Sequence, residues 1–125
     1  MRSSNSKKKR KYRKLSDGEL LEAIRAGRFA TDDEGNVYSV NGKQTQLATY
    51  LDHQQRPCIR AYLAGGRRAT TVGRLVWMIR HRQIVPGDMA VDHVNRNKHD
   101  NRPENLRLVD FSENSRQNQY WDEDF

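Results

Sequence analysis

The sequence is poor in cysteine and in apolar residues. Cys58 is the one cysteine among 125 residues, which excludes an internal disulfide and any zinc site built from several thiolates. No apolar run approaches the roughly 20 residues that a membrane span needs. The basic N-terminus lacks the apolar segment of a signal peptide, so we expect a cytoplasmic protein.

The chain is also short and polar, which limits the kind of site it can hold. Apolar residues make up 34% of the sequence and charged residues 31%. A chain of this size and composition forms one small domain with a thin core. It can carry a shallow surface site but not a large enclosed cavity.

The positive charge is concentrated in two segments. Residues 1–14 hold eight lysines or arginines and no acid, so the remainder, with 15 basic and 16 acidic side chains, is nearly neutral although the net charge is +7. Residues 51–82 contain seven arginines against one aspartate. Such concentration favours a polyanionic partner. The N-terminal segment has no apolar periodicity, and we expect it to be disordered until it binds.

Local patterns predict a helix followed by a small sheet and a second helix. Ser16 and Glu19 form a capping box ahead of apolar residues at helical spacing, and Gly27 is placed to end the helix. Asn41-Gly42 predicts a hairpin. The predicted strands cover 36–40, 44–50, 57–63 and 67–71, and the second helix covers 72–82. We therefore expect an α+β fold with a three- or four-stranded sheet over 28–71.

The last region has the pattern of a strand, a loop, a strand and a helix. Residues 90–94 form a short apolar strand that carries Asp92 and His93 side by side, and residues 105–109 form the second strand. A capped helix that carries Asn114 follows. Adjacent residues of a strand point to opposite faces, so Asp92 and His93 can flank one phosphate only where the strand bends or ends.

These residue types favour hydrolysis assisted by a metal. Asp92 and Asn114 offer carboxylate and amide oxygens, which are hard ligands suited to one Mg²⁺ or Mn²⁺ ion. His93 is left to act as a general base, the usual role of a histidine near neutral pH. The other histidines are expected to be structural or surface residues: His53, His81 and His99.

The motif D-H-V-N-x-N-K-x-D-N-R-x-E-N-L-R, followed by E-N-x-x-x-N, resembles the HNH endonuclease family, most closely its phage and intron-homing branch. The preceding G-R-L-V-W…P-G is similar too, so the resemblance covers about residues 72–118. It implies a ββα-metal finger, which agrees with the order of elements read from the pattern.

The resemblance also implies roles for individual residues. His93 would activate the attacking water, and Asp92 and Asn114 would ligate a single divalent metal. Asn105 matches the middle letter of the motif, so it would tether the loop and orient the histidine. Many relatives have a histidine where Asn114 stands, a departure that favours Mg²⁺ over zinc.

Residues outside this set are expected to hold the loop or to contact DNA. Asp100, Asn101 and Arg102 would hold the loop through turn-type side-chain bonds. Arg74 stands where relatives often have a histidine, so we expect only a DNA contact from it. The full set of expected DNA contacts is Arg56, Arg60, Arg67, Arg68, Arg74, Arg80, Arg82 and Arg102, with Lys7, Lys8, Lys9, Arg10 and Lys11 of the N-terminal arm.

Together these patterns predict three regions and one activity. Residues 1–15 form a basic disordered arm, 16–71 a helix-plus-sheet region that grips DNA, and 72–125 the HNH finger with its leading helix. We expect an endonuclease that nicks double-stranded DNA, as a monomer or a homodimer, with no membrane partner. Two alternatives stay open: a catalytically silent DNA-binding module or regulator, and an RNA- or ribosome-associated basic protein supported by charge alone.

Overall fold

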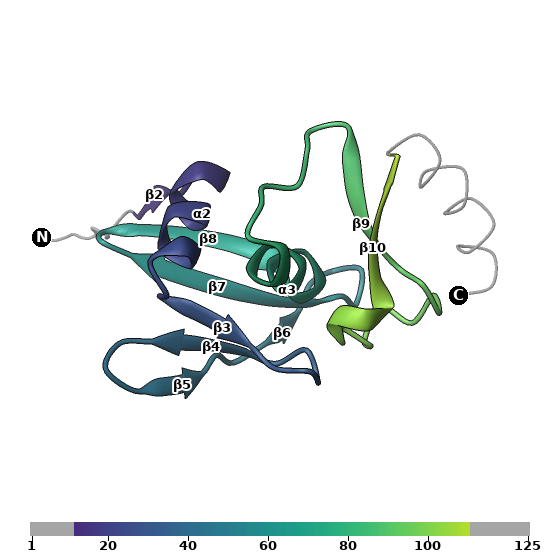
Figure 1. Ribbon diagram of the computed structural model, residues 1–125, viewed down its shortest axis with the longest axis horizontal. Helices are drawn as coiled ribbons and strands as arrows, with labels where there is room; N and C mark the ends of the chain where they lie inside the picture. The colour runs from purple at the N-terminus through teal and green to yellow at the C-terminus, as the bar shows by residue number, and fades with distance from the viewer. Residues whose placement is uncertain (1–11, 111–125) are drawn as a thin grey trace, which may run out of the picture.

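Two α-helices lie among three small sheets in residues 12–110, the part of the chain that the computed structural model describes (Figure 1). The fold class is α+β, as predicted. Neither helix in that range has the length and apolar character of a membrane span. In chain order the elements are β2 (Arg13–Lys14), α2 (Asp17–Arg25), β3 (Phe29–Thr31), β4 (Val37–Val40), β5 (Gln44–Gln46), β6 (Tyr50–Leu51), β7 (Pro57–Leu63), β8 (Gly66–Thr71), α3 (Val72–His81), β9 (Met89–His93), the 3₁₀ turn η1 (Pro103–Asn105) and β10 (Leu106–Asp110).

Helix α2 begins where the capping pattern predicts. Ser16 Oγ accepts a hydrogen bond from the backbone N of Glu19 at 3.1 Å, and Glu19 Oε1 accepts one from the backbone N of Ser16 at 2.9 Å. These bonds satisfy N–H groups that the start of a helix leaves without intrahelical partners. Leu20 and Ile24 are buried on the inner face, and Gly27, at a φ of 81°, lets the chain turn away.

The strands before α3 form two sheets, where the sequence predicted one. Strands β3, β4 and β5 form the first, and the order β2-β8-β7-β6 forms the second. The backbone N of Leu47 still donates to Val37 O at 2.9 Å, but Val37 is the first residue of β4 and the preceding Asn36 belongs to a turn. The strand predicted at 44–50 therefore extends beyond the end of β4, its partner. Tyr50 pairs with β7 instead.

The first described residues are ordered against the second sheet, although the sequence predicted a disordered arm as far as residue 15. Arg13 and Lys14 form β2, which runs parallel to β8 at the edge of the sheet. Leu15 is only 2% exposed, and its side chain fills the space that a Cβ at Gly66 would need. Burial of this leucine anchors the segment. Residues 1–11 lie outside the described range.

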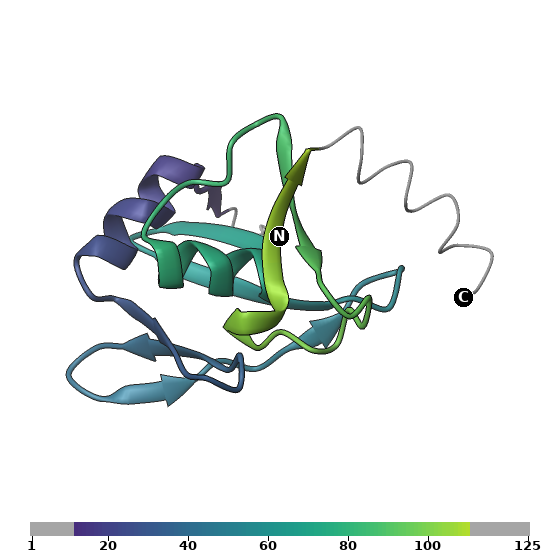
Figure 2. The same cartoon turned by 45° about the vertical axis from the view of Figure 1, so that its right-hand side comes forward.

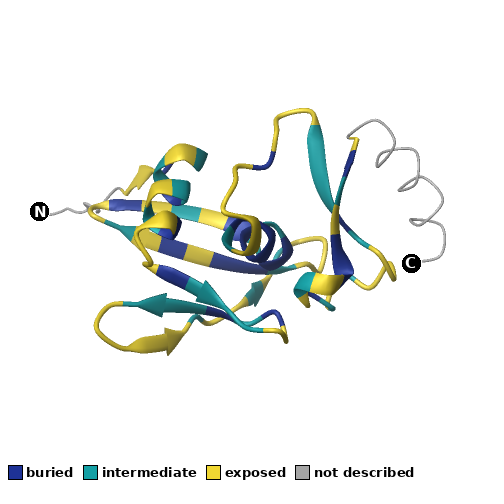
Figure 3. Cartoon of the chain, in the orientation of Figure 1, coloured by how far each residue is buried: buried dark blue, intermediate teal, exposed yellow. Residues whose placement is uncertain are grey.

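Helix α3 is buried on nearly all sides (Figure 3). Thr71 Oγ1 accepts from the backbone N of Arg74 at its start, and Arg82 ends it in a left-handed conformation. Both sheets, α2 and the β9–β10 ribbon pack against it. One hydrophobic cluster therefore joins the region expected to grip DNA (16–71) to the finger (72–125), and their division into separate units stays a prediction.

The β9–β10 ribbon lies at the end of the molecule opposite β2 and is fastened to α3 by one face (Figures 1 and 2). Leu106 and Val91 join the main core from this face. Strand β10 begins at Leu106, one residue later than predicted, because Pro103–Asn105 form the turn η1. The predicted final helix, with Asn114, falls in residues 111–125, outside the described range.

Candidate functional site

Strand β9 presents its two polar residues to opposite sides of the ribbon. Asp92 lies opposite Arg107 in the register, and His93 lies opposite Leu106. Residues directly opposite each other in an antiparallel pair point to the same face. His93 therefore shares the core-facing side with Leu106, while Asp92 shares the other side with Arg107. Because β9 ends at His93, both side chains stand at the end of the strand.

Asp92 is buried and paired. Its residue is 3% exposed, and Oδ2 accepts from Nε of Arg107 at 3.2 Å and from Nη2 at 3.0 Å. A buried carboxylate is unfavourable unless it is hydrogen-bonded or paired, and Arg107 meets that need. Among residues 12–110, no donor is bonded to Oδ1. A cation could therefore bind to Oδ1 while Oδ2 stays bonded to Arg107.

His93 is half-buried beside the first turn of α3. Its Nε2 lies 2.8 Å from Oδ1 of Asn101, within hydrogen-bond distance. Gly73 of α3 faces this pair, and a Cβ on that glycine would lie 2.9 Å from Asn101 Oδ1 and 3.3 Å from His93 Nε2. The histidine ring and the amide thus fill the space that a side chain at position 73 would take.

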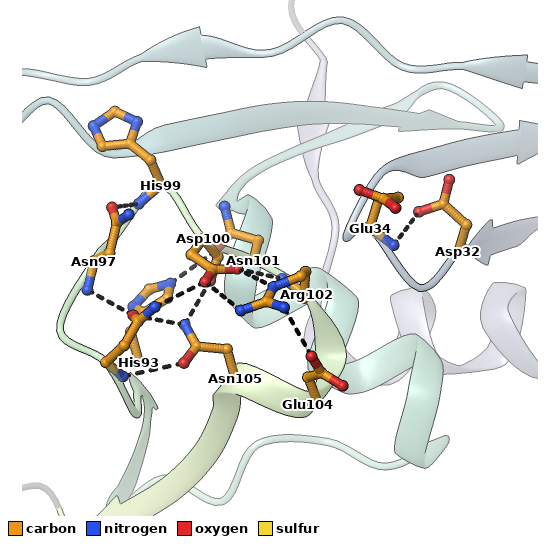
Figure 4. Close-up of polar contacts among 11 residues, drawn as sticks. Asp32, Glu34, His93, Asn97, His99, Asp100, Asn101, Arg102, Glu104 and Asn105 are labelled. Carbon is orange, nitrogen blue, oxygen red and sulfur yellow. Dashed lines mark hydrogen bonds and ion pairs between the residues drawn. The ribbon is translucent and has the colours of Figure 1, made fainter.

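Asn105 tethers the loop between the two strands (Figure 4). Its Nδ2 donates to Asn95 Oδ1 at 2.9 Å and to the backbone O of Asp100 at 2.8 Å, and its Oδ1 accepts from the backbone N of Asn95 at 3.1 Å. Asn105 is 5% exposed, so these bonds satisfy a buried amide. The contact to the ring of His93 comes from Asn101, the residue expected only to hold the loop.

Asp100 and Arg102 are paired with each other within the loop (Figure 4). Two bonds of 2.8 Å run from Nε and Nη2 of Arg102 to the carboxylate of Asp100, and Asn95 Nδ2 donates to the same carboxylate. The bond from Arg102 holds the pKa of Asp100 well below its ordinary value. Arg102 also donates to Glu104 at 2.8 Å, so its guanidinium is engaged by two carboxylates.

Two of the expected DNA contacts lie on the outer face of the second sheet, among tyrosines. The guanidinium of Arg60 lies 4.2 Å from the centre of the Tyr50 ring, and that of Arg67 lies 5.7 Å from the Tyr12 ring. Both arginines are exposed. Neither forms an ion pair within the described range. Each guanidinium therefore lies over an aromatic ring and is also exposed to solvent.

The remaining arginines of this region have partners within the protein. Arg68 and Arg74 both bond to Asp17, at 2.7 Å and 3.0 Å, and these bonds lower the pKa of that carboxyl, with Arg74 contributing most. The exposed ones are Arg56, paired with Asp52; Arg80, paired with Asp33; and Arg82, which donates to Arg25 O. Residues 7–11 of the arm lie outside the described range.

The described residues contain one of the two side chains expected to ligate a metal, Asp92. Within residues 12–110, no three histidine, cysteine, aspartate or glutamate side chains come together as metal ligands. Asp92 supplies a carboxylate oxygen, and a magnesium ion, which keeps several waters, needs few protein ligands. The carboxylate therefore fits a hard cation, and the second ligand expected from the motif, Asn114, lies outside the described range.

Residues 72–116 match the profile of the HNH endonuclease family. The matched segment is similar to HNH endonucleases and contains Asp92, His93, Asn105 and Asn114. A similar solved structure is that of the HNH homing endonuclease I-HmuI, described for DNA binding and cleavage, with a TM-score of 0.60 and 26% identity over 75% of this chain. The similarity covers 53% of I-HmuI, so this chain corresponds to about half of that protein. No curated protein matches the sequence.

The structure adds three residues to the surroundings of the HNH motif that the sequence did not assign there. Arg107, the last letter of E-N-L-R, pairs with Asp92, and this pairing depends on the strand register. Asn101 contacts His93, although its position in D-N-R predicted only a loop bond. Gly73 is the first letter of the similar segment G-R-L-V-W, but the sequence did not predict its contacts, because these depend on what packs against α3.

Proposed function

We propose that this protein is a DNA endonuclease of the homing type that depends on one divalent metal and uses His93 as general base. The observation that carries the proposal is the placement of Asp92 and His93 at the end of β9 in an HNH segment. A buried carboxylate and a half-buried imidazole stand there on adjacent residues, each held by a bond to a neighbour. A phosphate at the strand end would be within reach of both.

His93 would take the proton of the attacking water. A positioned general base contributes roughly 10²–10⁴-fold to the rate of such a step. The bond between the His93 ring and Asn101 and the packing against α3 limit the movement of the ring, so it is already oriented before DNA binds.

Asp92 and Asn114 would hold the metal. Oxygen ligands of this type suit Mg²⁺ or Mn²⁺, whereas structural zinc sites favour thiolate and imidazole. Such a cation, when bound, stabilises negative charge on the phosphate and on the leaving oxygen. Asp92 is suited to this role because its burial and its bond to Arg107 fix the carboxylate in place.

The substrate would be double-stranded DNA, gripped by the outer face of the second sheet and by the basic arm. The grip is supported by the exposed charges of Arg60 and Arg67, which add to the lysines and arginine at 7–11. For Arg68 and Arg74 we propose a structural role instead, because both are bonded to Asp17. One chain carries one Asp92–His93 pair, so a monomer would nick one strand in each binding event.

The second candidate function is a DNA-binding module that keeps the finger without catalysis. The observation that favours it is the ion pair between Asp92 and Arg107, since a carboxylate that already has a cationic partner does not require a metal. The same surfaces would then bind DNA and leave it uncut.

The test is nicking of supercoiled plasmid by the purified protein with Mg²⁺ or with EDTA. We expect conversion to open circles only with the metal, loss of conversion in His93→Ala, and the parental rate in His99→Ala, since His99 is an exposed histidine of the same loop. If His93→Ala nicks at the parental rate, the assignment of the base is wrong. Wild-type protein that retards the plasmid but never nicks it with Mg²⁺ or Mn²⁺ would favour the silent module.

A further inference from the structure

We infer that Asn101 is the positioning residue of His93: its amide oxygen accepts the hydrogen of Nε2 and leaves Nδ1 as the unprotonated nitrogen of the neutral ring. The contact itself depends only on this structure. Its consequence for cleavage rests on the proposed function, in which His93 is the general base.

The chemistry of the amide decides which ring nitrogen carries the hydrogen. A side-chain amide oxygen accepts hydrogen bonds and cannot donate them, so the nitrogen that bonds to it must be an N–H. Neutral imidazole has one N–H, and the bond of 2.8 Å from Nε2 to Asn101 Oδ1 therefore leaves the lone pair on Nδ1. Asn101 is 7% exposed, which limits the competition of water for its oxygen.

Two glycines from distant parts of the chain leave the space that Asn101 occupies. Gly73 of α3 leaves room for the amide, because a Cβ there would lie 2.9 Å from Oδ1. Gly35, in the turn between β3 and β4, has a φ of 85°, and a Cβ there would lie 2.3 Å from the backbone O of Asn101. The backbone of Asn101 thus packs against the turn at Gly35, while its side-chain amide packs against α3 at Gly73.

Asn105, the middle residue of the motif, acts one step further from the ring. Its amide bonds to Asn95 and to the backbone O of Asp100, the residue before Asn101. It therefore fixes the loop from which Asn101 reaches His93. A change at Asn105 would disturb the whole loop, whereas a change at Asn101 would remove the contact to the ring.

The experiment combines NMR of the His93 ring nitrogens in metal-free protein with single-turnover nicking of plasmid. Asn101→Leu keeps a side chain of similar size and removes the acceptor, and Asn101→Asp keeps an acceptor. Asn97→Leu is the matched control, because Asn97 is an exposed amide of the same loop that bonds to the backbone of His99. Gly73→Ala displaces the amide while Asn101 is still present, and alanine favours helix more than glycine.

We expect wild type and Asn97→Leu to have a protected His93 Nε2–H signal with an unprotonated Nδ1. Asn101→Leu and Gly73→Ala should lose that protection and nick about 10- to 100-fold more slowly at saturating DNA, with DNA affinity unchanged. This loss is smaller than the roughly 10²–10⁴-fold effect of a general base, because His93 itself is still present. Asn101→Asp should keep the signal and recover part of the rate. If Asn101→Leu fails to fold, Gly73→Ala gives the same readouts.

The two proposals fail in different ways. An unchanged Nε2–H signal in folded Asn101→Leu or in Gly73→Ala would overturn the inference, as would nicking by either variant at the wild-type rate. If wild-type protein never nicks DNA but its Nε2–H protection depends on Asn101, the positioning contact stands and the proposed function alone is wrong.

Discussion

Asp92 and Arg107 face each other across the β9–β10 ribbon, with Nη2 of the arginine 3.0 Å from Oδ2 of the aspartate. The side chain of Asp92 is 3% exposed and that of Arg107 is 48% exposed. The pair therefore joins a buried carboxylate, our proposed metal ligand, to a cation that solvent reaches. A bound metal and Arg107 would neutralise the same charge.

Removal of this arginine should make the protein depend more on the metal. Arg107→Ala leaves Asp92 buried without its cationic partner, and we expect a loss of about 1–3 kcal/mol in the free energy of unfolding. Mg²⁺ should raise the melting temperature of Arg107→Ala more than that of wild type, because the ion supplies the missing charge. Thermal unfolding with and without Mg²⁺ measures both effects, with Arg107→Lys as the control that keeps the charge. A midpoint of Arg107→Ala that does not respond to Mg²⁺ would argue against Asp92 as a ligand.

The two arginines on the outer face of the second sheet should govern the salt dependence of DNA binding. If Arg60 and Arg67 each neutralise one phosphate, the double alanine variant should lower the slope of log K against log salt concentration by about 1.8. A titration of duplex DNA at several salt concentrations measures the slope. Arg25→Ala, an exposed arginine of α2 that donates to Arg82 O, is the control and should change it little. An unchanged slope in the double variant would place the DNA elsewhere.

Asp17 should be far more important for stability than a surface carboxylate. It accepts from both Arg68 and Arg74, whose side chains are 16% and 26% exposed. Asp17→Asn should lower the free energy of unfolding by about 1.5–3 kcal/mol, because two confined guanidiniums lose their counter-charge. Asp33→Asn is the control: Asp33 pairs with Arg80 but is 95% exposed, and its loss should cost about 0.2–1 kcal/mol. Equal losses in a urea titration would contradict this distinction.

The turn between β3 and β4, which packs against Asn101, should be less stable in acid. Hydrogen bonds, chiefly from the side chain of Asn36, lower the pKa of Asp32 from 3.8 to about 2. Since the folded pKa is the lower one, the stabilisation is present above pH 3.8 and is lost as the pH falls toward 2. Asp32→Asn should therefore flatten the fall of the melting temperature in this window. A parallel fall in wild type and Asp32→Asn would refute the assignment.

Local signals in the sequence predicted most of the elements. The capping box at Ser16 and Glu19 and the Asn41-Gly42 hairpin are both present, and β7 has the predicted bounds, 57–63. Each depends on bonds between residues that are near one another in the chain or on steric preferences of single residues. Each of these signals involves only a few neighbouring residues, so it can be recognised in a single sequence.

The strands that depend on distant partners were predicted less well. Strand β5 ends early because β4 begins at Val37 and offers no further partner, and β2 is ordered because Leu15 enters a core made by later residues. The division of the strands into two sheets follows from the same constraint. The sequences of these strands alone do not show where β5 ends, that β2 is ordered, or that the strands divide into two sheets.

For the site, the sequence by itself determined which residues carry the HNH pattern and that adjacent Asp92 and His93 point to opposite faces of a strand. Only the tertiary structure decided which neighbours those two side chains meet. Arg107 reaches Asp92 through the register of the ribbon, and Asn101 reaches His93 because Gly73 leaves space for it. The reason is physical: a residue's type and its place in a strand are local properties, whereas hydrogen-bond partners depend on how separate segments pack.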